Sequence, residues 1–368
     1  MNHLWTALAV AAAAVVVATL LADRLRRRRD EAQAYLKGVR SVILGDPDAA
    51  IEALSDAARL GHPEAVETYL ALGALFRREG DFARAVRLHR NMLMGPNLPP
   101  PRRPEVEREL AEDYRRSGML VEAAEIYMRL GPEDRAALAG LRDVRVEQGD
   151  LAAAAELQRR LGEPGAGDPV LAHLLAAQAR EVLPQDAARA GALAREALGA
   201  HADSADAWLA LAEAEGARAS SAAALEAIGR ALDLDPRAAL QAWPALREVP
   251  DREGVVRFLE ARLVLRPEDP GLHVVHARAL DRAGRRPEGF AAVRRALDHD
   301  HTGEVTFALR ELLRSERAVR PDELAARHDL LVAALLRKGR APKCSRCGAD
   351  APGRAWRCRR CGAWDSIP

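Results

Sequence analysis

A pattern of large and small apolar residues recurs along the middle of the chain and limits the possible folds more than any other feature. Its spacing follows the period of an α-helix, and we find no convincing strand-like alternation. The two clearest copies contain Tyr69, Leu72, Gly73, Phe76, Gly80 and Ala85, and Trp208, Leu211, Ala212, Ala224, Ile228, Ala231 and Pro236. Because small residues let two helices approach closely and large ones fill the space to the next helix, the pattern predicts stacked pairs of helices.

The offsets between these residues fit the 34-residue tetratricopeptide pattern, in which each repeat is a helix pair. Weaker copies lie around Gly38, Leu110, Leu141 and His273. Proline-rich stretches at residues 96–104 and 162–169 interrupt the pattern and are expected to form loops between repeats. We therefore predict an all-α fold, a tetratricopeptide-repeat superhelical solenoid over residues 35–340.

The first helix of each pair in such a solenoid lines a concave groove. By this register the groove residues are Glu67, Leu70 and Arg77 in one repeat, and Arg108, Glu112 and Arg115 in a later one. Their mixed charge suits a polar peptide or a protein partner, although each residue taken alone also fits an ordinary solvated face. Partner binding is the common use of this architecture, and this step is an analogy from fold.

The four cysteines of the chain lie within its last 25 residues, as two Cys-x2-Cys pairs: Cys344 with Cys347, and Cys358 with Cys361. Two such pairs can close a tetrahedron of sulfur around one metal ion. The 28-residue tail, residues 341–368, is too short to bury a core of its own and needs such a crosslink. We predict a small four-cysteine zinc-ribbon or rubredoxin-like domain with one zinc ion.

Other interpretations of the cysteines remain open. Iron is the main alternative to zinc, because four thiolates suit either metal. Two disulfides would need an oxidising compartment, and a redox Cys-x-x-Cys normally lies at a junction of strand and helix. The tail is also basic, which could indicate nucleic-acid binding, but four thiolates on a divalent metal carry a net negative charge that much of this excess balances.

The amino-terminal segment is apolar enough to span a membrane. Residues 4–22 carry no charge and would span roughly 28 Å as a helix, close to the thickness of a bilayer core. Arginines follow at once, at Arg24 and Arg26–Arg29. Since positive flanks stay cytoplasmic, we predict a single-pass anchor at residues 1–23, a basic linker at 24–34, and the bulk of the chain in the cytoplasm. A buried alanine-rich helix of a soluble domain is the alternative.

No catalytic constellation stands out in the sequence. Signature motifs of nucleotide-binding loops, serine hydrolases and zinc proteases are absent, and acidic residues are scattered. His273 and His276 fall on core positions of a repeat, so packed side chains are expected there. A balance of 55 basic against 54 acidic residues argues against a general nucleic-acid binder. Because no catalytic constellation is found, the sequence favours a non-enzymatic protein.

The order of anchor, repeat array and metal ribbon resembles the lipopolysaccharide assembly protein B family. The resemblance is most specific at Leu72–Asp81 and in the tail from Ala355 to Ile367. It implies that the ribbon packs against the repeats, with Trp356 and Trp364 as aromatic contacts. Arg359 stands where proline usually follows the third cysteine, and Ala349 where an aromatic residue is common. These departures concern the partner surface more than the architecture.

The resemblance also implies a role and partners. Members of the family are inner-membrane scaffolds that regulate lipopolysaccharide synthesis. They bring the deacetylase of the committed lipid A step to the membrane protease FtsH for degradation, and gather other synthesis enzymes. A homo-oligomer is possible. Two alternatives remain open: a general membrane-tethered scaffold for another protein complex, and a regulator that responds to thiol oxidation or metal.

Overall fold

The computed structural model describes residues 16–22, 26, 33, 36–37, 63–95, 98–162, 167–299, 342–351 and 355–367. Within these ranges, no helix combines the length and hydropathy needed to cross a bilayer. Most of the anchor expected at residues 1–23 lies outside the described residues, as do most of the linker at 24–34 and the parts of the array at 38–62 and 300–340. The single-pass anchor therefore stays a prediction.

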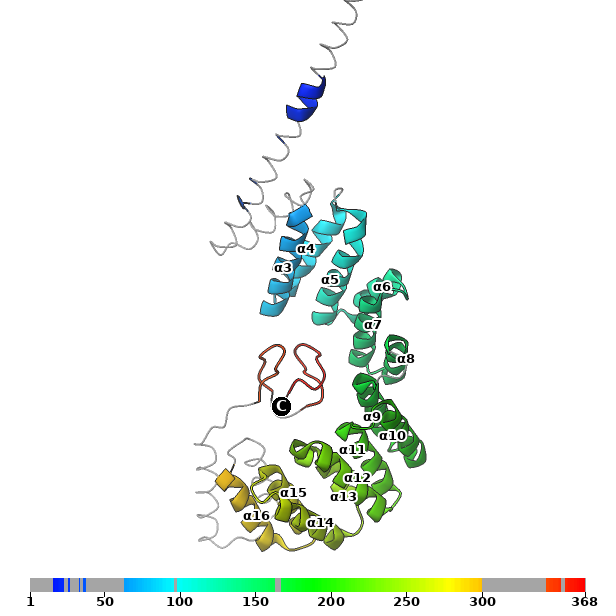
Figure 1. The fold of residues 1–368 in the computed structure, drawn as a ribbon, viewed down its shortest axis with the longest axis vertical. Coiled ribbons are helices and arrows are strands. Elements are labelled where there is room, and N and C mark those ends of the chain that lie inside the picture. Colours follow the sequence, from blue (N-terminus) through cyan, green and yellow to red (C-terminus); the bar gives the residue numbers. More distant parts are fainter. Residues whose placement is uncertain are drawn as a thin grey trace, which may run out of the picture. The chain divides into compact units, whose positions relative to one another are not determined.

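The described part of the array is helical throughout (Figure 1). It divides into two compact units. The unit that ends at Asp150 contains α3 (Pro63–Glu79), α4 (Phe82–Met94), the 3-10 helix η1 (Pro100–Arg102), α5 (Arg103–Arg116), α6 (Leu120–Leu130) and α7 (Arg135–Glu147). The unit that begins at Leu151 contains α8 (Leu151–Leu161), α9 (Pro169–Val182), α10 (Ala187–Ala200), α11 (Ala205–Ala217), α12 (Ser221–Leu234), η2 (Pro236–Ala242), α13 (Trp243–Glu248), α14 (Arg252–Leu265), α15 (Pro270–Arg282) and α16 (Arg286–His299). The C-terminal ribbon belongs to this second unit.

The turn inside a helix pair is built on one backbone position with positive φ. Gly80, Gly118, Gly149 and Gly284 occupy it with φ between 81° and 87°, a region that residues with a Cβ rarely adopt. Between α11 and α12 the same position is Ala219, with φ 60°. In these five helix pairs the sequence therefore stops the first helix at a fixed point, and the second helix folds back beside it.

Capping side chains set where several helices begin. Asp134, Asp168 and Ser204 each accept a hydrogen bond from the backbone N–H three residues later, at the first turns of α7, α9 and α11. Pro244 explains why η2 and α13 stand in the second unit where a single regular first helix is expected. Proline lacks an N–H and cannot continue a helix, so the segment divides into η2 and α13.

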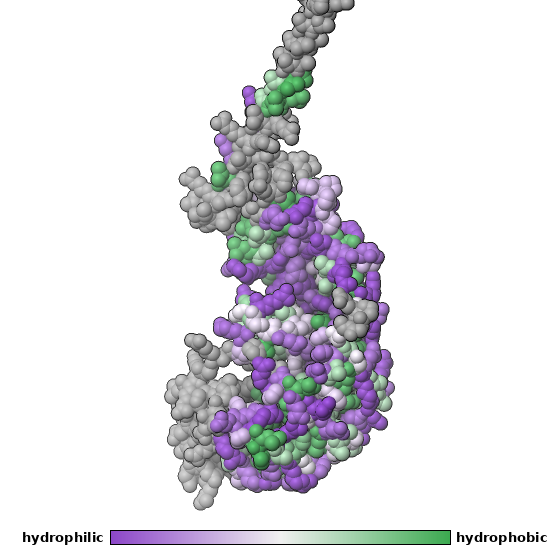
Figure 2. Space-filling model, in the orientation of Figure 1, coloured by the Kyte–Doolittle hydropathy of each residue, from purple (hydrophilic) through white to green (hydrophobic). Residues whose placement is uncertain are grey.

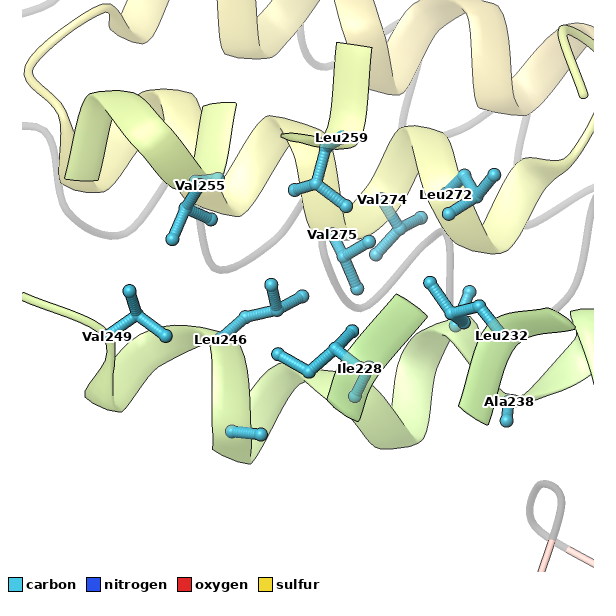
Figure 3. Packing of buried hydrophobic residues seen from close by; sticks show 14 of the residues in the cluster. Ile228, Leu232, Ala238, Leu246, Val249, Val255, Leu259, Leu272, Val274 and Val275 are labelled. Atoms are coloured by element: carbon cyan, nitrogen blue, oxygen red, sulfur yellow. The ribbon is translucent and has the colours of Figure 1, made fainter. Parts of the chain in front are cut away.

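The core of the second unit is rich in alanine, with larger residues between α12 and α15. Figure 3 shows Ile228 and Leu232 of α12 facing Leu259 of α14 and Val275 of α15. Trp356 of the ribbon packs against this same cluster. Hydrophilic residues cover most of the visible surface of the repeats, and hydrophobic ones appear there only in small groups (Figure 2). The ribbon is thus held against a folded part of the array.

Close approach of helices makes Gly140 a sensitive position. A Cβ added at this glycine of α7 would overlap the buried ring of Tyr127 in α6. We expect Gly140→Ala to destabilise the protein by about 1–3 kcal/mol, because the ring or the helix must shift. Gly199→Ala is the matched control, since nothing lies within 4 Å of the added Cβ in α10. Thermal unfolding followed by circular dichroism should show an unchanged or slightly higher midpoint for the control. Equal midpoints for the two variants would contradict the packing.

Candidate metal centre and its contact with the repeats

The ribbon consists of two copies of one backbone turn. In the first, the N–H of Gly348 donates to the carbonyl of Cys344 over 2.8 Å, and the N–H of Cys344 donates to that of Ala349 over 2.9 Å. In the second, Gly362 and Cys358 make the equivalent 2.8 Å bond. Gly348 and Gly362 both have positive φ, which lets each turn close behind its second cysteine. Each turn therefore aims two sulfurs at one point.

One backbone hydrogen bond joins the two turns: the N–H of Ser345 donates to the carbonyl of Ser366 over 2.7 Å. Within the second turn, the N–H of Asp365 donates to the carbonyl of Trp356 over 2.7 Å. Single β-bridges pair Lys343 with Asp350 and Arg357 with Trp364. This small set of bonds encloses few buried side chains, so the fold depends on a link through the cysteines.

The four sulfurs lie within 4.8 Å of one another. Cys344 Sγ is 3.7 Å from Cys361 Sγ, and Cys347 Sγ is 3.8 Å from Cys358 Sγ. At a zinc–sulfur distance of about 2.3 Å, sulfurs at the corners of a tetrahedron lie about 3.8 Å apart. The donor set therefore fits a tetrahedral metal ion, and the cluster is a metal-binding site.

The two ends of the cluster differ in how readily a thiol loses its proton. The Ser366 hydroxyl lies 3.3 Å from Cys344 Sγ and lowers the pKa of this thiol to about 6. Burial raises the pKa of Cys361 to about 12. Because a metal ion binds the thiolate form, the lowered pKa of Cys344 favours metal binding by this ligand at neutral pH.

One histidine of the repeats joins the ribbon to the array. His173 of α9 stacks against Trp364, with ring centroids 5.2 Å apart and an interplanar angle of 11°. Trp356 lies against the same imidazole at 5.3 Å. His173 Nε2–H donates to Asp365 of the ribbon over 3.0 Å, and Nδ1–H donates to Asp206 of α11 over 2.7 Å. We call these five side chains the latch: His173, Asp206, Trp356, Trp364 and Asp365.

The electrostatics of the latch keep His173 and Asp206 ionised. Burial by itself would lower the pKa of His173, but the hydrogen bonds to Asp206 and Asp365 outweigh burial and raise this pKa to about 9. Burial would raise the pKa of Asp206, yet Arg180 at 2.8 Å and His173 hold it below its usual range. Arg180 also pairs with Glu213 over 2.9 Å. At neutral pH the ribbon is therefore attached through a positively charged imidazolium.

The two latch residues of the array, His173 and Asp206, lie at helix positions equivalent to those that the sequence assigns to the groove. Glu67, Leu70 and Arg77 follow one another at steps of three and seven residues. Val170, His173 and Arg180 repeat these steps in α9. In α11 the first two positions are Asp206 and Leu209. Sequence reasoning missed His173, although the capping residue Asp168 fixes the register of its helix and was the available signal.

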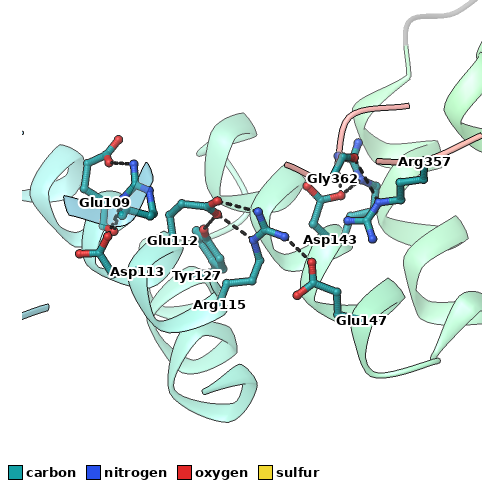
Figure 4. A network of polar contacts seen from close by, with 11 residues as sticks. Glu109, Glu112, Asp113, Arg115, Tyr127, Asp143, Glu147, Arg357 and Gly362 are labelled. Atoms are coloured by element: carbon teal, nitrogen blue, oxygen red, sulfur yellow. Dashed lines mark hydrogen bonds and ion pairs between the residues drawn. The ribbon is translucent and has the colours of Figure 1, made fainter. Parts of the chain in front are cut away.

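The charged groove residues named from the sequence lie in the first unit and form ion pairs, and Figure 4 shows those of Arg115 with Glu112 and Glu147. Arg77 pairs with Asp113 at 2.6 Å and with Glu109 at 2.7 Å. Arg115 pairs with Glu112 at 2.6 Å and also with Glu147. These bonds link α3 to α5 and α5 to α7. The network thus connects successive first helices.

The remaining groove residues differ in exposure. Glu67 pairs with Arg102 at 2.5 Å, and its side chain is 68% exposed. Arg108 pairs with Asp134, the residue that caps α7. Leu70 is buried in the core of the first unit. A partner that binds in this groove would therefore contact a charged surface whose side chains are already paired with one another.

His273 and His276 lie packed within the second unit. His273 Nε2 is 2.7 Å from the carbonyl oxygen of Pro267. Burial lowers the pKa of His276 to about 4, so this imidazole is neutral at physiological pH. In the part of the chain that the structure describes, the cysteine cluster alone has the side-chain geometry of a metal site.

The helix pairs and the cysteine cluster define a tetratricopeptide-repeat protein with a metal-binding ribbon. Residues 343–368 match the family described as rubredoxin metal binding domain. Lipopolysaccharide assembly protein B of Escherichia coli is 28% identical over 112 residues, which cover 29% of this chain and 28% of the relative. The match thus spans little more than a quarter of the relative's length. The chain is a repeat protein similar to lipopolysaccharide assembly protein B.

Two solved structures of repeat proteins also align with the chain. A tetratricopeptide repeat protein from Parabacteroides merdae covers 73% of this chain and 98% of its own, at 14% identity and a TM-score of 0.41. The C-terminal part of a repeat-containing protein from Cytophaga hutchinsonii covers 75% of this chain and 99% of its own, at 12% identity and a TM-score of 0.45.

The raised pKa of His173 predicts that the ribbon detaches at alkaline pH. A pKa near 9 in the docked state, against about 6.5 in an unfolded chain, means that the stabilisation is complete below pH 6.5 and is lost as pH rises through 9. We expect hydrogen exchange in the metal-loaded ribbon to accelerate between pH 7 and 9.5, after correction for the intrinsic exchange rate. His173→Gln cannot titrate and should lack this step. A step of equal size in this variant would assign it to another group.

Proposed function

We propose that this chain is a non-enzymatic adaptor at the inner membrane that regulates lipopolysaccharide synthesis. In this proposal it presents the deacetylase of the committed lipid A step to the membrane protease FtsH and organises other synthesis enzymes. The proposal rests on one observation. The metal ribbon is bound to the repeat array through His173, whose position in its helix is equivalent to a groove position in the other repeats. The similarity to lipopolysaccharide assembly protein B supports the choice of pathway.

The physical basis of such a role is confinement. An anchor at residues 1–23 would hold the array at the cytoplasmic surface of the bilayer, where a membrane protease also acts. Confinement to one surface raises the concentration of each partner near the other without new contacts. The array supplies a long polar surface for recognition, and its ion-paired first helices, such as those of Arg77 and Arg115, hold that surface rigid.

We propose that the metal in cells is zinc. Four buried or half-buried thiols in a closed tetrahedron form the donor set of a structural zinc site. The donor set also suits iron, so metal analysis of the protein purified from its native cells decides between them. One equivalent of zinc is expected. One equivalent of iron, with the visible absorption of an iron(III)–thiolate, would contradict the assignment.

Affinity capture of the full-length protein from its native cells tests the adaptor role. Cys344→Ser/Cys347→Ser removes two metal ligands, and Arg346→Gln is a matched control at an exposed position of the same turn. We expect the intact protein and the control to recover FtsH and lipid A enzymes, and the double variant to recover fewer of them. A reproducible set of unrelated partners would instead indicate a general scaffold.

A further inference from the structure

A cleft of about 450 Å³ lies at the junction between the ribbon and the repeats. The ribbon contributes Ser345, Trp356, Asp365 and Ile367 to its lining. The repeats contribute residues where first helices begin, including Pro169 at the start of α9 and Asp203 before α11. All of these residues belong to the second unit. The cleft exists only when the ribbon is docked, because neither side encloses it alone.

The walls of the cleft combine an aromatic ring, apolar side chains and carboxylates. Trp356, Pro169 and Leu234 form apolar surface, and the Leu234 side chain is 41% exposed although it is large and hydrophobic. Asp203, Asp235 and Asp365 place three carboxylates around this surface. An apolar wall next to negative charge suits a side chain that has an aliphatic stem and a cationic end.

The charges already present leave one carboxylate for an incoming cation. Asp365 is bonded to His173, and Asp235 lies 3.5 Å from Arg237. Asp203 is exposed and forms no ion pair among the described residues. Arg237 is the single guanidinium in the lining, and its side chain is 66% exposed. A ligand cation would therefore be attracted by Asp203 and repelled by Arg237.

We propose that this cleft binds an arginine side chain presented by an extended segment of a partner protein. A planar guanidinium can stack on an indole and donate two parallel hydrogen bonds to a carboxylate, whereas a lysine ammonium lacks the planar geometry. The volume exceeds that of one arginine side chain, so flanking backbone enters as well, beside the exposed Ser345. The site goes beyond the proposed function, since an adaptor of any pathway could read a client through it.

The test uses the purified full-length, metal-loaded protein and two labelled peptides. The first is a seven-residue glycine-serine peptide with one central arginine, and the second has citrulline in its place, which keeps the shape and removes the charge. Binding is measured by fluorescence anisotropy at low salt. We expect saturable binding of the arginine peptide and at least roughly fivefold weaker binding of the citrulline peptide, because a charge-assisted hydrogen bond is lost.

Two substitutions should act in opposite directions. Asp203→Asn is expected to weaken binding of the arginine peptide roughly threefold to tenfold, and Arg237→Gln to strengthen it by a similar factor, since it removes a competing cation. Glu226→Gln is the matched control: an exposed carboxylate of α12 outside the cleft, whose loss should leave affinity within about twofold. All three positions are exposed enough to be replaced without loss of folding.

The signs of these effects decide the outcome. If Arg237→Gln weakens binding and Asp203→Asn strengthens it, Asp203 does not attract the guanidinium and the proposal is wrong. Equal affinities for the arginine and citrulline peptides would also overturn it, as would absence of binding to the intact protein. Because the measurement uses peptides alone, a negative result would not contradict the proposed role in lipopolysaccharide synthesis. Conversely, evidence against that role would not contradict arginine binding in the cleft.

Discussion

Replacement of Cys358 by serine should release the metal and unfold the ribbon while the repeats stay helical. Cys358 is 3% exposed, and its sulfur lies 3.8 Å from that of Cys347 across the cluster. A structural zinc ion in a small domain contributes an apparent binding free energy of about 10–16 kcal/mol, and little else in the ribbon replaces it. Metal content should fall from one equivalent per chain to nearly zero.

Tryptophan fluorescence and hydrogen exchange report the structural consequence. Loss of the ribbon fold frees Trp356 and Trp364 from His173, so their emission should shift to longer wavelength. Exchange in residues 342–367 should become fast, and circular dichroism at 222 nm should change little. Ser345→Ala, at an exposed neighbouring position, is the control and should keep its metal. A Cys358→Ser protein that retains one equivalent of metal would show that the cluster is not the metal site.

Substitution of His173 by alanine should detach the ribbon and leave its metal in place. The change leaves the buried Asp206 with Arg180 alone, removes the bond to Asp365, and opens a space between two indole rings. Removal of one partner from a buried ion pair costs about 3–5 kcal/mol. Because Asp365 is half exposed and can be solvated when released, we expect about 2–4 kcal/mol.

Limited proteolysis separates detachment from metal loss. Cleavage between the array and the ribbon should accelerate at least tenfold in His173→Ala, while metal content stays at one equivalent. His201→Ala removes a second half-buried histidine of the same unit and should leave the rate unchanged, because His201 forms no bond to the ribbon among the residues that the structure describes. An unchanged rate in His173→Ala would mean that the tryptophan contacts alone hold the ribbon.

The repeat register and the cysteine cluster were the parts most accessible from the sequence. Gly80, Gly118 and Gly149 mark the ends of first helices because a positive φ favours glycine, so the turns could be read directly. The spacing of the two Cys-x-x-Cys pairs likewise limits the geometry to one shared centre, and the sulfurs lie where this spacing requires. Both features depend on short stretches of chain.

The latch could not be predicted because its partners are distant in sequence. His173 and Asp365 are separated by 192 residues, and no local pattern records that one faces the other. The ion pairs of Arg77 and Arg115 illustrate the same limit. The helical period placed these residues on one face, but only the stacking of α3, α5 and α7 determines that their carboxylate partners come from the next first helix.

The measurement that tests the adaptor account most directly is the half-life of the lipid A deacetylase in cells depleted of this protein. After synthesis is stopped, the account predicts a clearly longer half-life on depletion. The intact chain should restore rapid turnover, Arg346→Gln should do the same, and Cys358→Ser should fail to do so. A deacetylase half-life that is the same with and without the protein would contradict the account.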